Sequence, residues 1–251
     1  MNALLALVPA FIGQAVAYFT VVGLVWWVVW RLLASRLAAR KLPAPVSTSR
    51  AQLVHELKYS LVTLAFATLG MLVVDALTSR GWAHLSADRS EFSTWQLVLT
   101  FVGLLLLNDL WFYGVHRLLH TPWAFKHVHA VHHRSVEVTP FSSYSFHPLE
   151  GVLLGAWIYP VALMVPLYLP MLGALQVIGL ANNVMSHLGY ELWPAWLLKV
   201  PGLRWINSAT FHSMHHTQVN GNYGLVLRVW DRLFGTALPG YEEAFVARRP
   251  R

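Results

Sequence analysis

Long uncharged stretches separated by short polar segments dominate the pattern of the chain. The first, 3–30, contains no charged residue and exceeds the length of about 20 residues that a membrane-spanning helix needs. Comparable apolar stretches follow at 57–77 and 95–115, and two shorter ones at 151–167 and 171–187 are separated by only a few residues. This pattern predicts an all-α membrane protein with about five spans, the last two forming a hairpin.

The composition supports a membrane protein over a soluble one. Charged residues make up 12% of the chain and the mean hydropathy is +0.49, whereas roughly a quarter of the residues in soluble domains are charged. The net charge of +7 does not indicate nucleic-acid binding, because the basic residues are scattered between apolar stretches and form no patch or motif. The chain has no cysteine, which excludes disulfides, cysteine-bound zinc and iron–sulfur clusters within it.

The distribution of lysine and arginine predicts the orientation of the spans. The polar segment 31–58 contains six of these residues and the segment 78–94 contains two. The positive-inside rule therefore places 31–58 in the cytoplasm and the N-terminus outside. The segments 116–147 and 187–251, which contain most of the histidines, then lie together on the cytoplasmic face.

A histidine motif, His-x-x-His-His, occurs twice in the chain. With 13 histidines in 251 residues, on the order of 0.03 such motifs are expected by chance. The two copies consist of His129, His132 and His133 and of His212, His215 and His216. Positions i, i+3 and i+4 share one helix face, so we expect each copy to direct three imidazoles at one point.

Three further histidines extend the set to nine. His116 and His120 are four residues apart just after the third span, and His187 ends the fifth. Nine imidazoles exceed the four ligands of a tetrahedral metal site and the six of an octahedral one. They predict two metal ions, each with four or five ligands and an open position. Imidazole binds iron, zinc, copper and nickel alike, so the ligands alone do not identify the metal.

Several polar residues near these histidines have two interpretations each. Asp109 is either a carboxylate that orients an imidazole or a polar residue at a helix end, and Asn183 is either a weak ligand or a packing amide. His147 is expected to support a ligand or the fold without binding metal itself, because Pro148 denies it a helical partner. His55, His84 and His127 are interpreted as interfacial or packed residues.

Other metal chemistries leave signatures that are missing here. The chain has no Glu-x-x-His pairs of a carboxylate di-iron bundle and no His-Glu-x-x-His motif of a metalloprotease or similar hydrolase. The alternative to an enzyme is a membrane metal-binding protein or transporter without redox catalysis. Transport usually requires polar residues near the middle of several spans, whereas Asp75 and Asp109 lie close to span ends. The pattern therefore favours an enzyme.

The motifs together resemble the fatty acid hydroxylase superfamily, also called the sterol desaturase family. The resemblance covers about 95–238 and rests on HRLLH, HAVHH, SFHPLEG, HLGYELWP, HSMHH and NYGLVLRVWDRLFGT. It implies an integral membrane oxidoreductase with a histidine-bound pair of iron ions. Such an enzyme uses O2 and external electrons to hydroxylate or desaturate a fatty acyl chain, sterol or related lipid. The implied iron ligands are His116, His120, His129, His132, His133, His187, His212, His215 and His216.

The resemblance also implies a domain organisation. Residues 57–251 form the family's four-helix membrane domain with a cytoplasmic histidine-rich cap, and 1–56 add a span and a basic connector. Some family members have histidine at the position of Asn183. The sequence contains no cytochrome b5, flavin or iron–sulfur motif, so electrons are expected from a separate donor protein. Hydroxylation and desaturation begin with the same hydrogen abstraction, and both agree with these residues.

Overall fold

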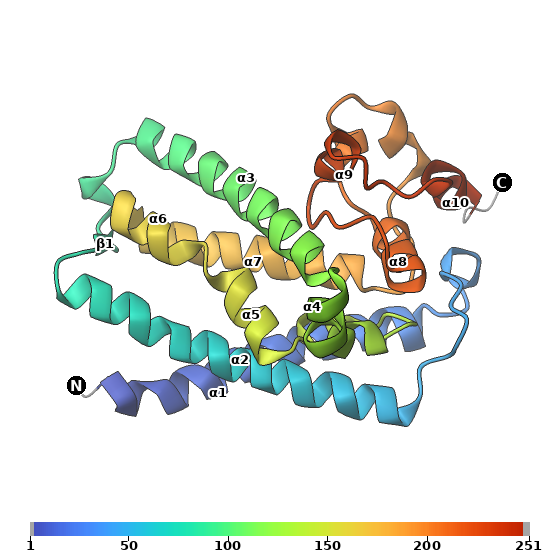
Figure 1. The fold of residues 1–251 in the computed structure, drawn as a ribbon, viewed down its shortest axis with the longest axis horizontal. Coiled ribbons are helices and arrows are strands. Elements are labelled where there is room, and N and C mark those ends of the chain that lie inside the picture. Colours follow the sequence, from blue (N-terminus) through green and yellow to red (C-terminus); the bar gives the residue numbers. More distant parts are fainter. Residues whose placement is uncertain (1–2, 248–251) are drawn as a thin grey trace.

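The computed structural model describes residues 3–247, and long helices make up most of it (Figure 1). Four of the described helical segments are long and apolar enough to cross a membrane. They are Leu5–Leu32, which joins α1 (Ala3–Trp26) to the π-helical Trp27–Leu32, α2 (Arg50–Ser79), α3 (Thr94–Leu119) and α7 (Leu169–Ser186). The structure thus has the helices of a multi-pass membrane protein.

Serine caps set the beginnings of two of these helices. The hydroxyl of Ser49 accepts a hydrogen bond from the Gln52 amide, and that of Ser93 accepts one from the Gln96 amide. Helix α2 therefore begins before the apolar stretch that predicted it, and Arg50 and Lys58 belong to its first turns.

The predicted fourth span, 151–167, is not one helix. It consists of α5 (Pro148–Gly155) and α6 (Ile158–Met164), with a break at 156–157. Pro160 explains the break, because proline has no amide hydrogen and its ring collides with the carbonyl four residues earlier, that of Ala156.

The hairpin nevertheless extends along the bundle. After α6, strand β2 (Leu167–Tyr168) pairs in parallel with β1 (Leu85–Ser86), which lies in the connection between α2 and α3. The Leu167 amide also donates a hydrogen bond to the His84 carbonyl, 2.8 Å away. The turn of the hairpin therefore lies at the end of the bundle where α3 begins, and α7 returns to the end where α3 finishes (Figure 1).

The remaining elements form a cap, defined as residues 120–147 and 187–247, at the C-terminal ends of α3 and α7 (Figure 1). Its α-helices are α4 (Pro122–His127), α8 (Ala209–Gln218), α9 (Val229–Leu233) and α10 (Tyr241–Ala247). Its 3-10 helices are His129–Arg134, Pro140–Tyr144, Ala195–Lys199 and Leu203–Trp205. Two more 3-10 helices, Ala38–Arg40 and Arg89–Glu91, lie in the connections between long helices.

Buried carboxylates on the long helices hold the cap in place. Glu56 of α2 is fully buried and accepts hydrogen bonds from the hydroxyls of Ser135 and Thr139, each at 2.7 Å. Asp109 of α3 accepts one from the Val226 amide and one from the Trp230 indole, each at 2.8 Å. Hydrogen bonds to a charged group are roughly twice as strong as neutral ones, so two distant parts of the cap are fixed to the bundle.

Candidate metal centre

The nine predicted histidines come together in the structure as two adjacent groups where the bundle meets the cap. Each histidine of a group contributes one ring nitrogen, and these nitrogens all lie within 4.8 Å of one another. The first histidine group contains His116, His120, His129, His133 and His215. The second histidine group contains His132, His187, His212 and His216. All of them except the half-buried His120 are buried.

The two His-x-x-His-His motifs are shared between the groups. The first group takes His129 and His133 from one motif and His215 from the other, whereas the second takes His212, His216 and His132. The prediction that each motif directs three imidazoles at one point is therefore wrong. On helix α8, position i+4 is rotated by about 40° from position i, and i+3 by about 60° in the opposite direction. The middle histidine consequently points to the neighbouring group.

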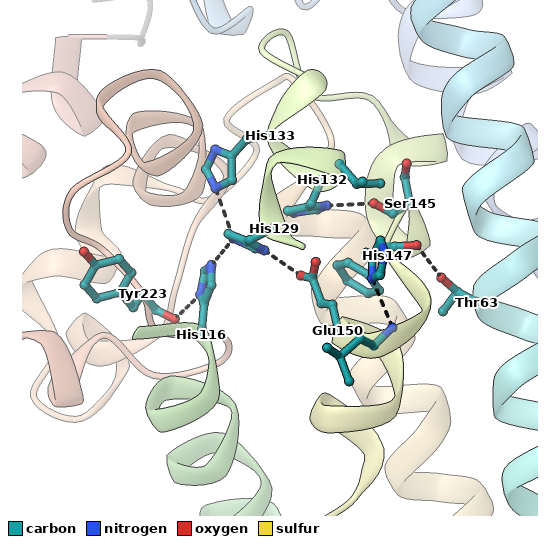
Figure 2. Close-up of polar contacts among 12 residues, drawn as sticks. Thr63, His116, His129, His132, His133, Ser145, His147, Glu150 and Tyr223 are labelled. Carbon is teal, nitrogen blue, oxygen red and sulfur yellow. Dashed lines mark hydrogen bonds and ion pairs between the residues drawn. The ribbon is translucent and has the colours of Figure 1, made fainter. Parts of the chain in front are cut away.

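The imidazoles present their Nε2 atoms to one another. In the first group, His129 Nε2 lies 3.1 Å from the Nε2 atoms of both His116 and His133 (Figure 2). In the second group, the corresponding distances are 3.3 Å for His132–His187, 3.0 Å for His187–His212 and 3.1 Å for His212–His216. Several imidazole nitrogens this close together are typical of ligands arranged around a cation.

The Nδ1 atoms determine which nitrogen keeps its lone pair. Four of them lie near backbone carbonyls, which can only accept: His116 near Tyr223 (2.8 Å), His132 near Ser145 (3.3 Å), His187 near Asn183 (2.9 Å) and His215 near Gly221 (2.7 Å). Each Nδ1–H therefore donates, and in the neutral imidazole Nε2 is left with its lone pair directed into the group. Such outer hydrogen bonds orient the histidine ligands of metal sites.

Burial keeps six histidines of the cap in the neutral form, which is the form that binds metal. It lowers the pKa of six cap histidines well below the ordinary value; they are His129, His132, His133, His212, His215 and His216. A neutral imidazole is the species that coordinates a metal ion. His215 Nε2 and both ring nitrogens of His120 are buried without a hydrogen-bond partner in residues 3–247, which costs about 1–3 kcal/mol for each such atom. The imidazole nitrogens of the two histidine groups thus fit two metal ions.

A small cavity adjoins both histidine groups. Its volume of about 10 Å³ corresponds to roughly one water-sized molecule. Phe112, Phe146 and Leu225 supply apolar walls, and Glu150 also lines it. The histidines that border it are His116, His129, His132, His187 and His212. A small reactant in this cavity would contact ligands of both groups while apolar side chains limit access of water.

For the three predicted supporting residues, no side-chain hydrogen bond within the described chain reaches an imidazole of the two groups. The Asp109 carboxylate binds the amides of Val226 and Leu227 and the Trp230 indole, which favours its structural interpretation. The Asn183 amide donates to the Ser143 carbonyl, and only its backbone oxygen holds His187. His147 caps α5 by accepting from the Leu149 amide.

The three remaining histidines lie outside both groups, as interpreted from the sequence. His55 Nε2 donates to the Val131 carbonyl, 2.9 Å away, and His84 Nε2 lies 2.8 Å from the Glu91 carboxylate. The His127 ring packs against Trp123, with their centroids 5.2 Å apart.

Glu150 is a site residue that the sequence reasoning missed. It lies in the first turn of α5, is 1% exposed, and its Oε1 is 2.8 Å from His129 Nδ1 (Figure 2). Its Oε2 has no hydrogen-bond partner within the described part of the chain. The available signal was a single acidic residue at the start of an otherwise apolar segment, because an ionisable residue in such a place is a functional candidate.

A tight loop supplies two of the carbonyls that orient histidines. Fully buried Asp231 holds this loop by accepting hydrogen bonds from the amides of Tyr223 and Gly224, each at 2.7 Å. A Cβ atom at position 224 would lie 2.6 Å from the Leu227 carbonyl oxygen, so only glycine fits there. The loop thereby fixes the Gly221 and Tyr223 carbonyls that hold His215 and His116.

Comparisons with known proteins identify the proteins that this chain resembles. A family model described as fatty acid hydroxylase matches residues 101–236. The chain is 30% identical to lathosterol oxidase of Homo sapiens, over 74% of this chain and 61% of that protein. It is 31% identical to Delta(7)-sterol 5(6)-desaturase of Leptosphaeria maculans, over 77% and 53%, and 33% identical to methylsterol monooxygenase 1 of Gallus gallus, over 61% and 51%. The matches thus span between 51% and 61% of the length of these relatives. No solved structure matches the chain.

Proposed function

Because the chain belongs to the fatty acid hydroxylase superfamily, the sterol desaturase family, we propose that it is a membrane-bound oxidoreductase. Its substrate would be a sterol or a related lipid, including a fatty acyl lipid, and its reaction the O2-dependent hydroxylation or desaturation of a C–H bond. The similarity to two sterol-oxidising proteins and a methylsterol monooxygenase supports this substrate class. The two histidine groups with inward-facing Nε2 atoms are the observation that carries the proposal.

Each histidine group would hold one iron ion. The first would supply five imidazoles as ligands and the second four. Bound iron would supply O2 activation and the removal of hydrogen from an unactivated C–H bond, for which amino-acid side chains lack the redox power.

The balance of the reaction requires an electron donor. Hydroxylation converts a lipid C–H bond, O2, two electrons and two protons into an alcohol and water. Desaturation uses the same reagents to remove two hydrogens and yields a double bond and two waters. We propose that a separate electron-donor protein supplies the electrons, since the sequence shows no flavin, cytochrome b5 or iron–sulfur motif.

The residues of the chain would position and shield the reacting groups. Backbone carbonyls hold four imidazoles in the required tautomer, and Glu150 holds His129. The apolar walls formed by Phe112, Phe146 and Leu225 would exclude water and admit a hydrocarbon segment of the lipid. The cavity volume of about 10 Å³ is far below the roughly 300–1,000 Å³ of pockets that hold drug-sized ligands. We therefore propose that side chains around the cavity move apart when the lipid binds.

The products test this function directly. Membranes of cells that express the protein are expected to contain lipids that have gained one oxygen atom or lost two hydrogen atoms. Mass spectrometry of extracted lipids, with cells expressing the His132→Ala variant as the matched control, detects either change. Identical lipid profiles in the two cell lines, with an electron donor present and the protein metal-loaded, would contradict the proposal.

The proposed orientation has a separate test. We propose that the histidine cap lies in the cytoplasm, because the positive-inside rule favours that side for the basic segment 31–58. Because the chain lacks cysteine, Arg36→Cys, Arg89→Cys and Gln218→Cys each introduce one label site at an exposed position. In intact cells, a membrane-impermeant thiol reagent should label position 89 from outside and leave 36 and 218 unlabelled. Labelling of position 36 or 218 from outside would reverse the orientation.

A further inference from the structure

A second cavity lies in the C-terminal part of the cap and is distinct from the one at the histidines. Its volume is about 280 Å³, more than tenfold what a single water requires. Its lining residues come from the 3-10 helix Leu203–Trp205, α8, α9, the segment 237–240 and the beginning of α10. Trp205, Arg228, Arg232 and Tyr241 are among its lining residues, together with the acidic Glu242 and Glu243.

Three arginines surround one aromatic ring at this cavity. The guanidinium carbons of Arg204, Arg228 and Arg232 lie 5.4, 5.7 and 5.4 Å from the centre of the Trp205 ring. Arg228 also lies 4.5 Å from the centre of the Tyr241 ring. Aromatic faces hold guanidinium groups without neutralising their charge. Two of the three arginines, Arg228 and Arg232, line the cavity, so two positive charges lie in its wall and a third, that of Arg204, lies behind it on the same ring.

The positive charge of this cluster is incompletely paired. Arg228 is 8% exposed; its Nε donates to the Arg204 carbonyl at 2.6 Å, and its Nη2 has no hydrogen-bond partner within residues 3–247. Glu242 is the nearest acid, at 3.4 Å from Arg204 Nη2 and 3.9 Å from Arg228 Nη2, and is half exposed. Burying a charge without a close partner is costly, so a fold that keeps Arg228 buried there favours binding of an anion.

We propose that this cavity binds a phosphate group. The planar fork of arginine matches the oxygens of phosphate, and two or three guanidinium groups together form a strong site for one. Binding would displace Glu242 from its long contacts and give the buried Arg228 nitrogen a partner. The same chemistry fits the headgroup of an anionic phospholipid and a soluble phosphate ester.

The surroundings of the cavity favour the phospholipid. Leu233 and Phe234 directly follow Arg232 and are 67% and 51% exposed. Phe234 stacks on Tyr113 of α3, with ring centroids 5.3 Å apart, so this side of the cap borders a helix that is apolar enough to cross a membrane. Apolar side chains beside a cluster of arginines are typical of a surface that lies on anionic lipid. Such a lipid would hold the cap against the bilayer.

Binding to the metal-loaded, full-length protein in neutral detergent tests this proposal without turnover, so its outcome is independent of the proposed oxidation. The probes are dioctanoyl phosphatidic acid, glycerol 3-phosphate and, as the phosphate-free control, dioctanoylglycerol. Calorimetry should show that Arg228→Gln and Arg232→Gln each weaken binding of phosphatidic acid by about tenfold, the value of one charge-assisted hydrogen bond. Arg80→Gln, at an exposed position between α2 and α3, is the control and should leave it unchanged.

Glu242→Gln is expected to change the affinity for phosphatidic acid in the opposite direction. It removes the competing acid, so binding of phosphatidic acid should become tighter, a change that general damage to the cap does not produce. Arg232 is exposed, and its variant keeps the test valid if Arg228→Gln fails to fold. Binding of phosphatidic acid alone identifies a lipid headgroup, and equal binding of glycerol 3-phosphate identifies a soluble phosphate ester. Unchanged affinity in Arg232→Gln and Glu242→Gln, or equal binding of dioctanoylglycerol, would overturn the proposal.

Discussion

Replacing either His132 or His215 with alanine is expected to abolish lipid oxidation. Each is the middle histidine of its His-x-x-His-His motif. His132 lies in the group that contains His212 and His216, and His215 lies in the group that contains His129 and His133. His132 Nε2 lies 3.3 Å from that of His187, and the His215 ring lies 4.5 Å from that of His116. Loss of either imidazole would remove one ligand of a proposed metal site and shift the histidines that share it. Turnover should fall by roughly a thousandfold or more, as it does when groups that act as a unit lose one member.

The double variant separates one shared centre from two independent sites. If the two groups work together, His132→Ala combined with His215→Ala should be no slower than either single variant, because each already removes the function. His84→Ala is the control, since His84 lies outside both groups and its ring Nε2 is 2.8 Å from the Glu91 carboxylate. Oxidised lipid is measured in membranes with equal amounts of each variant. Substantial turnover in either single variant would show that the groups are not a common centre.

Replacing Glu150 with alanine is expected to loosen the metal and slow the reaction. Its carboxylate lies 2.8 Å from His129 Nδ1, and the Nε2 of this histidine faces two others of the first group. Loss of such a hydrogen-bond partner typically lowers metal affinity or activity by roughly 10- to 100-fold. The rate at which a chelator removes metal from the purified protein should rise accordingly, which is a readout separate from turnover.

Two further variants show whether Glu150 acts through His129. Glu150→Gln retains an oxygen that accepts from the imidazole and should release metal more slowly than Glu150→Ala. Asp88→Ala changes a carboxylate in the connection between α2 and α3 and should release metal like the unmodified protein. The metal-free forms of all three should unfold at similar temperatures, because apolar packing maintains the helices. Equal release rates from Glu150→Ala and the unmodified protein would show that the carboxylate does not support the centre.

The sequence predicted the parts of this protein that depend on composition and local spacing. Long apolar stretches indicated four helices correctly, because burial in lipid requires about 20 apolar residues whatever the fold. The order and spacing of the histidine motifs indicated the family, which the match to 101–236 confirms. The nine histidines were expected to meet, and the structure brings all nine into two groups.

The parts that depend on tertiary contacts were not predictable. Helical spacing alone suggested that His129, His132 and His133 point to one place, whereas their division between two groups requires the opposing α8. Glu150 is distant from His129 in sequence, and the Gly221 and Tyr223 carbonyls lie in a loop whose shape depends on buried Asp231. No local pattern encodes such pairings. The helix break at 156–157 could have been predicted, because Pro160 is visible in the sequence.

The number of metal ions in each chain is the most direct test of the central claim, that two histidine groups form a dinuclear centre. Protein purified in its active form after growth with ample iron is analysed for metals and for protein concentration in the same sample. We expect two metal ions per chain, mainly iron; zinc in place of some iron leaves the claim intact, because imidazole sites also accept zinc. One metal ion or fewer per chain in intact, fully active protein would contradict it.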